Sequence, residues 1–219
     1  MNLGDNLNKY KSIVFDCDGV ILNSNQIKTD AFYDATIMFG ARLAGQFRKY
    51  HTANGGISRY EKFQYFFRNI LKREYLNNEL DDLIDKYSVI VASKLRDSEV
   101  VEGLNEFRDR TKNIKWHIVS GGDQQEIRNV FEEKKIMGYF DGGIFGSPDD
   151  KVSILKREID AGNISLPALF LGDSKYDFLA ASTAGLDFIF MYQWTELENW
   201  DQWCFEQKIV PFKTIVEIQ

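Results

Sequence analysis

Short apolar runs alternate with amphipathic segments over the second half of the chain, from about Glu99 onward. Short runs bounded by turn residues are typical of buried strands, whereas apolar positions that recur every three or four residues are typical of helices. With one more run near the N-terminus, strands are expected at 12–15, 115–119, 143–145, 168–171 and 187–191. Helices are expected between them at 124–134, 152–161 and 176–184. This alternation predicts an α/β fold with a parallel sheet.

The pattern changes between the first strand and the rest of the sheet. Apolar residues there recur at helical spacing without strand-like alternation, as at Ala31, Ala35, Met38 and Phe39, at Tyr60, Phe63, Phe67, Ile70 and Leu71, and at Leu80, Leu83, Ile84, Tyr87, Val91 and Leu95. We therefore expect an inserted all-helical cap domain at 23–96 and a core domain formed by 1–22 and 97–219. The polar stretches 23–25 and 96–98 are the expected hinges.

Composition and charge narrow the class of protein. A chain of 219 residues with 44% apolar residues can bury a substantial core, and its net charge of −6 argues against a surface built for nucleic acid or anionic lipid. No stretch approaches the ~20 apolar residues of a membrane span, and no apolar segment follows a basic start. Cys17 and Cys204 lie far apart in the sequence, which makes a disulfide framework improbable. The cytoplasm is the expected location.

The first strand ends in two carboxylates. Asp16 and Asp18 follow its apolar run and stand one residue apart, with a turn glycine, Gly19, behind them. At the mouth of a low-dielectric crevice the two would repel each other unless a cation or a shared proton relieved them. The pair therefore indicates a hard metal ion or acid–base chemistry. A solvated loop that happens to hold two aspartates is the alternative.

Polar residues also follow two other expected strands. Ligands of open parallel sheets bind at the carboxyl ends of the strands, where Ser120 and Asp173 lie. The hydroxyl of Ser120 can donate a hydrogen bond, and Gly121 and Gly122 behind it allow close backbone approach, which suits a phosphate oxygen at a helix start. A turn with a helix cap is the alternative for this segment.

Lys151 opens a predicted helix, which is the unfavourable end of the helix dipole for a cation. Something negative should compensate it, either Asp149 or Asp150 as a cap, or a bound ligand together with Asp16. Asp173 and Asp177 then stand four apart at the next strand-to-helix junction. Asp173 can ligate the same cation as Asp16. Asp177 can orient that cation, although a carboxylate in a first helical turn is also common for dipole reasons alone.

These residues carry a resemblance. Their order resembles the four motifs of the haloacid dehalogenase-like superfamily, in the branch of helical-capped phosphoglycolate phosphatases and beta-phosphoglucomutase-like proteins: Asp16-x-Asp18-Gly19-Val20, then Ser120, Lys151, and Gly172-Asp173-Ser174-x-x-Asp177. The match runs from Ser12 to about Asp187. The resemblance implies a Rossmann-like doubly wound core, a Mg²⁺ cofactor and an aspartyl-phosphate intermediate.

The resemblance also implies roles for the carboxylates. Asp16 would be the nucleophile, while Asp18 would protonate the leaving oxygen and then activate water. Mg²⁺ would lie between Asp16, Asp173 and the backbone carbonyl of Asp18, with Asp177 orienting the site. Asp18 must be protonated for part of the cycle, and burial under a closed cap would favour its neutral form.

The remaining roles concern the phosphate and the rest of the substrate. Ser120, Gly121 and Lys151 would hold phosphate oxygens. Arg59, after the flexible stretch 54–58, can reach an anionic or hydroxylated substrate, and this stretch is similar to a Gly-x-Ser-Arg cap loop of the beta-phosphoglucomutase-like branch. A solvent-exposed arginine is the alternative. Lys28 stands where mutases of that branch usually have a histidine, which disfavours a mutase.

The leading interpretation is a phosphatase acting on a small phosphorylated metabolite, either a sugar phosphate or a phosphoglycolate-like ester. A sugar phosphomutase, a dehalogenase and a non-catalytic phospho-receiver or binding module are the alternatives. His51 and His117 are the only histidines, so a histidine-ligated transition metal is improbable. The sequence does not separate a monomer from a homodimer.

Overall fold

A computed structural model describes residues 7–218 and shows a sheet of six parallel strands in the order β3-β2-β1-β4-β5-β6. The strands are β1 (Ser12–Phe15), β2 (Lys115–Asp123), β3 (Gly143–Ser147), β4 (Ala168–Gly172), β5 (Asp187–Met191) and β6 (Pro211–Phe212). All five expected strands are confirmed, and β2 and β3 extend further toward the site than expected. β6 was not expected, because a strand of two residues carries no periodic signal.

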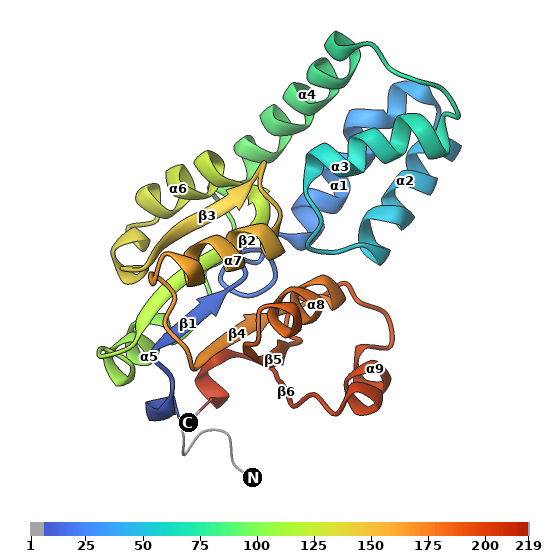
Figure 1. The fold of residues 1–219 in the computed structure, drawn as a ribbon. Coiled ribbons are helices and arrows are strands. Elements are labelled where there is room, and N and C mark those ends of the chain that lie inside the picture. The colour runs from blue at the N-terminus through green and yellow to red at the C-terminus, as the bar shows by residue number, and fades with distance from the viewer. Residues whose placement is uncertain (1–6, 219) are drawn as a thin grey trace.

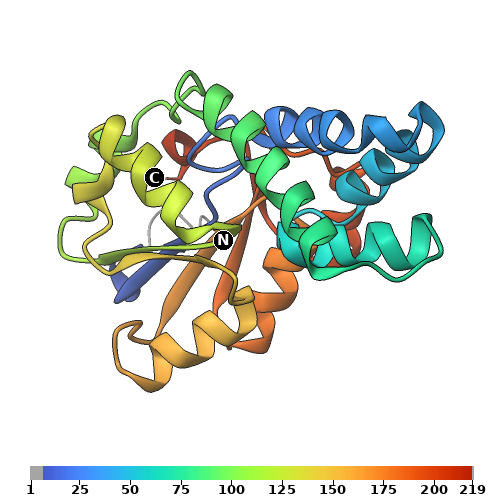
Figure 2. The same cartoon turned by 90° about the horizontal axis from the view of Figure 1, so that it is seen from above.

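Helices cover both faces of the sheet (Figure 2). They are α5 (Leu104–Arg110), α6 (Gln124–Glu133), α7 (Lys151–Asp160), α8 (Lys175–Thr183) and α9 (Trp200–Gln207), with short 3-10 turns at Met137–Tyr139 and Ile215–Glu217. Side chains of β1 alternate between the two layers. Phe15 packs with Phe107 of α5, whereas Val14 lies in the other cluster with Leu155 of α7. Burial on both faces explains why the strands are continuously apolar.

A helical insertion follows β1 and lies beyond the carboxyl ends of the strands (Figure 1). It consists of α1 (Asn25–Thr36), a 3-10 turn (Ile37–Phe39), α2 (Ala41–Ala53), α3 (Arg59–Tyr65), a π-helical turn (Phe66–Ile70) and α4 (Asn77–Leu95). Aromatic side chains pack its centre, with Phe32 against Phe47, Phe63 and Tyr87. The exact domain limits, 23–96 for the cap and 1–22 with 97–219 for the core, stay a prediction.

The strand order positions the site. The chain passes from β1 to β2 and β3 on one side, then crosses to β4 on the other side of β1. The carboxyl ends of the neighbouring strands β1 and β4 thus lie at a topological switch point, which is where open α/β sheets bind ligands. The expected α/β class, a doubly wound parallel core with an inserted helical cap, is confirmed. Among the described helices, none combines the length and the apolar character needed to cross a membrane.

Candidate active site

Three buried carboxylates meet at this switch point. Asp16 follows β1, Asp173 follows β4 and Asp177 lies in the first turn of α8; one carboxylate oxygen from each lies within 4.8 Å of the others. Gly19 has a φ of +77°, and a Cβ there would lie 2.2 Å from Oδ2 of Asp173. The turn after β1 therefore needs glycine both for its backbone conformation and for the close approach of Asp173.

Lys151 is fully buried beside these carboxylates. Its Nζ lies 2.8 Å from Oδ2 of Asp16 and 2.5 Å from Oδ1 of Asp177. These two carboxylates compensate the cation at the helix start. Asp150 instead caps α7 by accepting a hydrogen bond from the Ser153 amide at 3.0 Å, so it offsets the helix dipole and does not pair with Lys151.

Asp149, the other expected partner of Lys151, lies elsewhere and forms an ion pair with Arg157 at 2.5 Å. Asp177 takes its place because α8 packs beside α7 and presents its first turn to Lys151. Asp177 is also held by Ser174: its Oδ2 accepts hydrogen bonds from the Ser174 amide at 3.0 Å and from the Ser174 hydroxyl at 2.6 Å. This capping box fixes Asp177 as a support for Lys151.

Asp16, Asp173 and Asp177 form the acid cluster, and Lys151 alone does not balance its negative charge. Burial raises the pKa of Asp16 against the opposing effect of Lys151, and burial together with Asp16 and Asp177 raises the pKa of Asp173 well above its ordinary value. Burial is the main cause of both shifts, and repulsion between the neighbouring carboxylates adds to it. A hard divalent cation prefers carboxylate oxygens and would relieve this repulsion. The residues present therefore fit Mg²⁺, with Asp16 and Asp173 as the carboxylates available to hold it.

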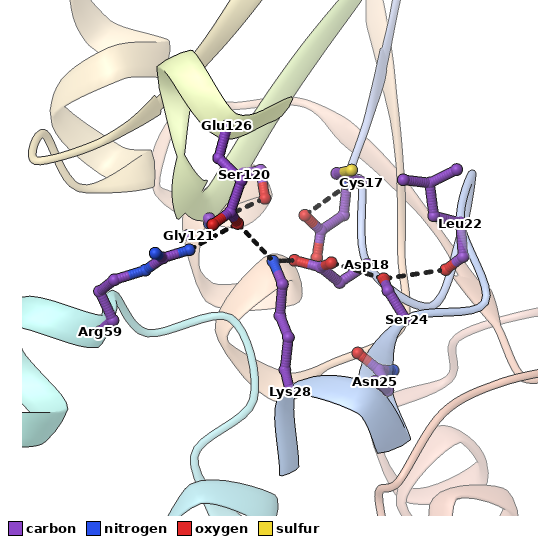
Figure 3. A network of polar contacts seen from close by, with 12 residues as sticks. Cys17, Asp18, Leu22, Ser24, Asn25, Lys28, Arg59, Ser120, Gly121 and Glu126 are labelled. Carbon is purple, nitrogen blue, oxygen red and sulfur yellow. Dashed lines mark hydrogen bonds and ion pairs between the residues drawn. The ribbon is translucent and has the colours of Figure 1, made fainter. Parts of the chain in front are cut away.

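Asp18 points away from this cluster toward the helical insertion. Its carboxylate accepts a hydrogen bond from the Ser24 hydroxyl at 2.6 Å and forms an ion pair with Lys28 at 2.5 Å (Figure 3). Burial alone would raise the pKa of Asp18, but Lys28 and Ser24 lower it below its ordinary value. The expectation that burial makes Asp18 neutral is wrong for this arrangement, because the insertion brings a cation into contact with it.

Ser120 lies inside β2 and is fully buried. Its Oγ accepts a hydrogen bond from the Gly122 amide at 3.0 Å, which braces the loop behind it. The helix-cap alternative is wrong for Ser120, since Asp123 caps α6 by accepting from the Glu126 amide. Gly121 and Gly122 line the cavity over the acid cluster, as expected for a loop that approaches a ligand through its backbone.

Arg59 lies in the first turn of α3 with 4% of its surface exposed. It donates a hydrogen bond to the Ser88 hydroxyl at 2.8 Å. Figure 3 shows its second contact, a hydrogen bond to Oε1 of Glu126 at 2.6 Å. The solvent-exposed alternative is wrong, because α6 of the core provides a buried carboxylate where Arg59 lies. Glu126 is also 4.0 Å from Lys28, so it links two cations of the insertion to the core.

A cavity of about 330 Å³ joins the acid cluster to the insertion. Asp16, Asp18 and Asp173 line it on the core side, and Lys28 and Arg59 line it on the other. The further polar lining residues, to which sequence reasoning gave no site role, include Asn25, His51, Lys62 and Glu196. Asn25 was assigned to a hinge, yet its side-chain amide donates to Oδ2 of Asp173 at 2.7 Å. Its position shortly after the first motif was the only feature of the sequence that indicated a place for Asn25 near the site.

The chain matches the family model of haloacid dehalogenase-like hydrolases over residues 13–191. This span includes the acid cluster, Lys151 and the whole helical insertion. The protein belongs to the haloacid dehalogenase-like hydrolase family and is an enzyme. The resemblance drawn from the four motifs is confirmed.

Solved structures share the fold at low sequence identity. A protein assigned as a phosphoglycolate phosphatase from Lactobacillus delbrueckii subsp. bulgaricus is 18% identical, with a TM-score of 0.71 over 96% of this chain and 97% of that one. A protein assigned as a beta-phosphoglucomutase from Bacteroides vulgatus is 15% identical, with a TM-score of 0.75 over 95% and 86%.

A predicted phosphatase from Clostridium acetobutylicum is 16% identical, with a TM-score of 0.74 over 95% of this chain and 96% of that one. A comparison with curated protein sequences finds no match. At these identities the structural similarity establishes the fold, and the substrate has to be inferred from the site itself.

Proposed function

We propose that this enzyme is a Mg²⁺-dependent phosphatase that hydrolyses a small phosphate monoester through an aspartyl-phosphate intermediate. The observation that carries the proposal is the convergence of three groups: Asp16 and Asp173, which line one cavity, and Lys151, which is buried in contact with Asp16. A carboxylate nucleophile, a buried cation and an acidic metal site are the groups that phosphoryl transfer requires.

Asp16 is the proposed nucleophile. One carboxylate oxygen forms a bond to phosphorus while the phosphorus–oxygen ester bond breaks and the alcohol oxygen leaves. Asp16 and Asp173 would hold Mg²⁺, and the bound ion would supply positive charge that lowers the repulsion between the nucleophile and the phosphate. Lys151 holds a phosphate oxygen from the other side, and Asp177 fixes the ammonium in place.

The loop Ser120–Gly122 is proposed to bind phosphate through its backbone. Ser120 braces the loop through its bond from the Gly122 amide, and Gly121 lines the cavity. Glycine at these positions lets backbone N–H groups come close to an anion. Because Ser120 Oγ only accepts in this contact, its own O–H is still available to donate to a phosphate oxygen.

Asp18 is the proposed general acid and base. It gives a proton to the leaving alcohol oxygen, then takes one from the water that attacks the aspartyl-phosphate, so that the ester and water become alcohol and phosphate. The ion pair with Lys28 favours the carboxylate form, which is the form needed for the second step. The first step requires this contact to loosen when the ester binds.

The helical insertion, proposed to be a cap at 23–96, is the part of the chain that would select the substrate. The volume of the cavity, about 330 Å³, is near the lower limit of the roughly 300–1,000 Å³ typical of small-molecule binding sites. It suits a metabolite the size of a sugar phosphate or a phosphoglycolate-like ester. The two buried cysteines, Cys17 and Cys204, are both free thiols, which is compatible with the proposed cytoplasmic location.

A panel of phosphate monoesters tests the proposal. The wild-type enzyme should release phosphate with Mg²⁺ present, and Asp16→Asn should lose at least a thousandfold in kcat while keeping its helical circular dichroism. Acid-quenched wild-type enzyme should carry one phosphoryl group on the peptide that contains Asp16. If no ester is hydrolysed faster by the wild type than by Asp16→Asn, the phosphatase proposal fails.

A sugar phosphomutase would use the same Asp16 and Asp18, and product analysis separates it from a phosphatase. With a sugar bisphosphate as primer, a mutase returns an isomeric sugar phosphate, whereas a phosphatase releases inorganic phosphate. A non-catalytic receiver would instead keep a long-lived aspartyl-phosphate. The insertion over the site argues against the receiver, because it encloses a cavity of metabolite size.

A further inference from the structure

Lys62 has no role in the proposed chemistry, yet it lies in the same cavity. It belongs to α3 of the insertion, is 2% exposed, and lines the cavity whose core side holds Asp16 and Asp173. Its Nζ lies 2.8 Å from Nδ1 of His51 on α2, which also lines the cavity. Two polar side chains of the insertion thus face the acid cluster across a space large enough for a small ester.

The other buried cations of the cavity have carboxylate partners. Lys28 pairs with Asp18, and Arg59 pairs with Glu126. Within residues 7–218, no carboxylate oxygen lies within the 4.0 Å of an ion pair from Nζ of Lys62. A charge on Lys62 therefore has only an uncharged neighbour, an arrangement that costs folding free energy.

The histidine does not compensate this charge. Burial and the nearby Lys62 ammonium lower the pKa of His51 well below its ordinary value, so its ring is neutral and Nδ1 accepts from Lys62. Burial and Lys28 in turn lower the pKa of Lys62 to about 7. The Phe32 ring centroid lies 5.5 Å from Nζ, and the carboxylates of Asp18 and Glu196 favour the charge only from beyond ion-pair distance. A purely structural role would be met better by an apolar side chain of similar volume.

We propose that Lys62, positioned by His51, binds a second anionic group of the substrate, at the end opposite the phosphate that reacts. The ligand chemistry is an anionic oxygen group, either a carboxylate or a second phosphate. Such a group gives Lys62 the charged partner that it lacks, in a site from which water is largely excluded. The substrate class is thereby narrowed to small phosphate monoesters that are anionic at both ends.

This inference rests on the proposed phosphatase function, and matched esters test both. The two-carbon set is phosphoglycolate, which carries a carboxylate, 2-hydroxyethyl phosphate, which is neutral there, and ethylene glycol bisphosphate. The three-carbon set is 3-phosphoglycerate, glycerol 3-phosphate and propane-1,3-diol bisphosphate. In at least one set the wild type should have a kcat/KM at least tenfold higher for a doubly anionic ester than for the neutral one, and the preferred member distinguishes carboxylate from phosphate.

Lys62→Met should remove that preference. We expect a 10- to 100-fold loss in kcat/KM for the doubly anionic ester, mainly through KM, and less than a threefold loss for the neutral ester. Lys49→Met, which removes an exposed lysine of α2, is the matched control and should change neither. His51→Leu should give a smaller loss with the same selectivity, because it removes only the positioning contact. Equal losses for both esters, or no preference in the wild type, would overturn the inference.

Binding without turnover separates this inference from the proposed function. Calorimetry on the folded wild-type chain compares 3-phosphonopropanoate with propylphosphonate, a pair that differs in the carboxylate and is not hydrolysed. Tighter binding of the carboxylate member, lost in Lys62→Met, supports the anion site even if no ester is hydrolysed in an Asp16-dependent manner. Hydrolysis without any such preference in turnover or binding retains the phosphatase and rejects the anion site.

Discussion

The guanidinium of Arg59, in the helical insertion, donates a hydrogen bond to Glu126, in the core, at 2.6 Å. Both side chains are almost entirely buried, and a cation of this kind in contact with a carboxylate is held strongly in its charged form. The ion pair joins α3 of the helical insertion to α6 of the core. It therefore fixes how the insertion sits over the acid cluster.

Breaking this pair should loosen the insertion. Arg59→Met leaves the Glu126 carboxylate buried with only the more distant Lys28 beside it, so we expect a loss of about 2 kcal/mol in the free energy of unfolding. The double variant Arg59→Met with Glu126→Gln should recover at least half of that loss, because no unpaired charge remains. Urea unfolding of the three variants measures both effects.

The exposed pair Arg73 and Glu79 is the control for the ion-pair prediction. Arg73→Met breaks a comparably short contact, at 2.7 Å, in solvent, where the charges remain hydrated. It should change the unfolding free energy far less than Arg59→Met. If Arg59→Met and Arg73→Met lower the free energy of unfolding by similar amounts, burial does not determine how much the Arg59 ion pair contributes to stability.

Gly121→Ala should separate the insertion from the core. A Cβ at Gly121 would lie 2.0 Å from the carbonyl oxygen of Gly56, so the loop of the insertion must move away. We expect at least a tenfold loss of kcat/KM and faster amide hydrogen exchange over 55–58, with helical circular dichroism unchanged. Gly138→Ala, where a Cβ meets nothing within 4 Å, should leave both unchanged. A fully active Gly121→Ala variant would contradict the close fit.

Removal of divalent cations should abolish activity and destabilise the fold. Burial and mutual repulsion disfavour the charged forms of Asp16 and Asp173, and a cation held by them would offset both, so saturating Mg²⁺ should raise the melting temperature of the metal-free enzyme by about 5 °C. The rise should be much smaller in Asp173→Asn and undiminished in Asp160→Asn, which removes an exposed carboxylate at the end of α7. Differential scanning calorimetry with and without chelator measures the shift.

Lys62 should make stability depend on pH above neutrality. Its pKa falls from 10.5 in the unfolded chain to about 7 in the fold, because burial and Lys28 disfavour the charge more than Asp18 and Glu196 favour it. The unfolded chain then binds more protons between pH 7 and 10.5, so this residue's contribution to stability rises with pH over that window.

Lys62→Met removes the free-energy cost of burying the Lys62 amine. The variant should be more stable than the wild type at pH 7 by on the order of 2 kcal/mol, and the difference should shrink as the pH approaches 10. Urea unfolding at several pH values measures it. A constant difference across the range would show that the Lys62 ammonium does not lose its proton on folding.

The order and spacing of polar residues along the chain predicted much of the core. Asp16 and Asp173 were assigned from their places at the ends of apolar runs, and the structure brings them together with Lys151. This works because parallel strands have a fixed direction, so every carboxyl end reaches the same edge of the sheet. Local pattern is therefore enough to locate a site of this kind.

The contacts across the insertion were not predictable in the same way. Arg59 was weighed against solvent exposure, and Lys62 and His51 were given no role in substrate binding. For Lys151 the expected partners were Asp149 or Asp150, or a ligand together with Asp16, and of these only Asp16 is in contact with it. The true partners lie on other elements: Glu126 is 67 residues from Arg59, and Asp177 is 26 residues from Lys151. Helical periodicity reports which face of a helix is apolar, but not which charge a neighbouring helix will present to it.

The sequence by itself determined the strand pattern, the helical insertion and the carboxylates at the strand ends, because these follow from local periodicity and strand direction. Only the tertiary structure decided which charges are paired. Asp18 forms an ion pair with Lys28, Arg59 forms one with Glu126, and Lys62 contacts only the neutral ring of His51. The physical reason is that ion pairing depends on distances of a few ångströms between elements, which are set by how the insertion packs onto the core.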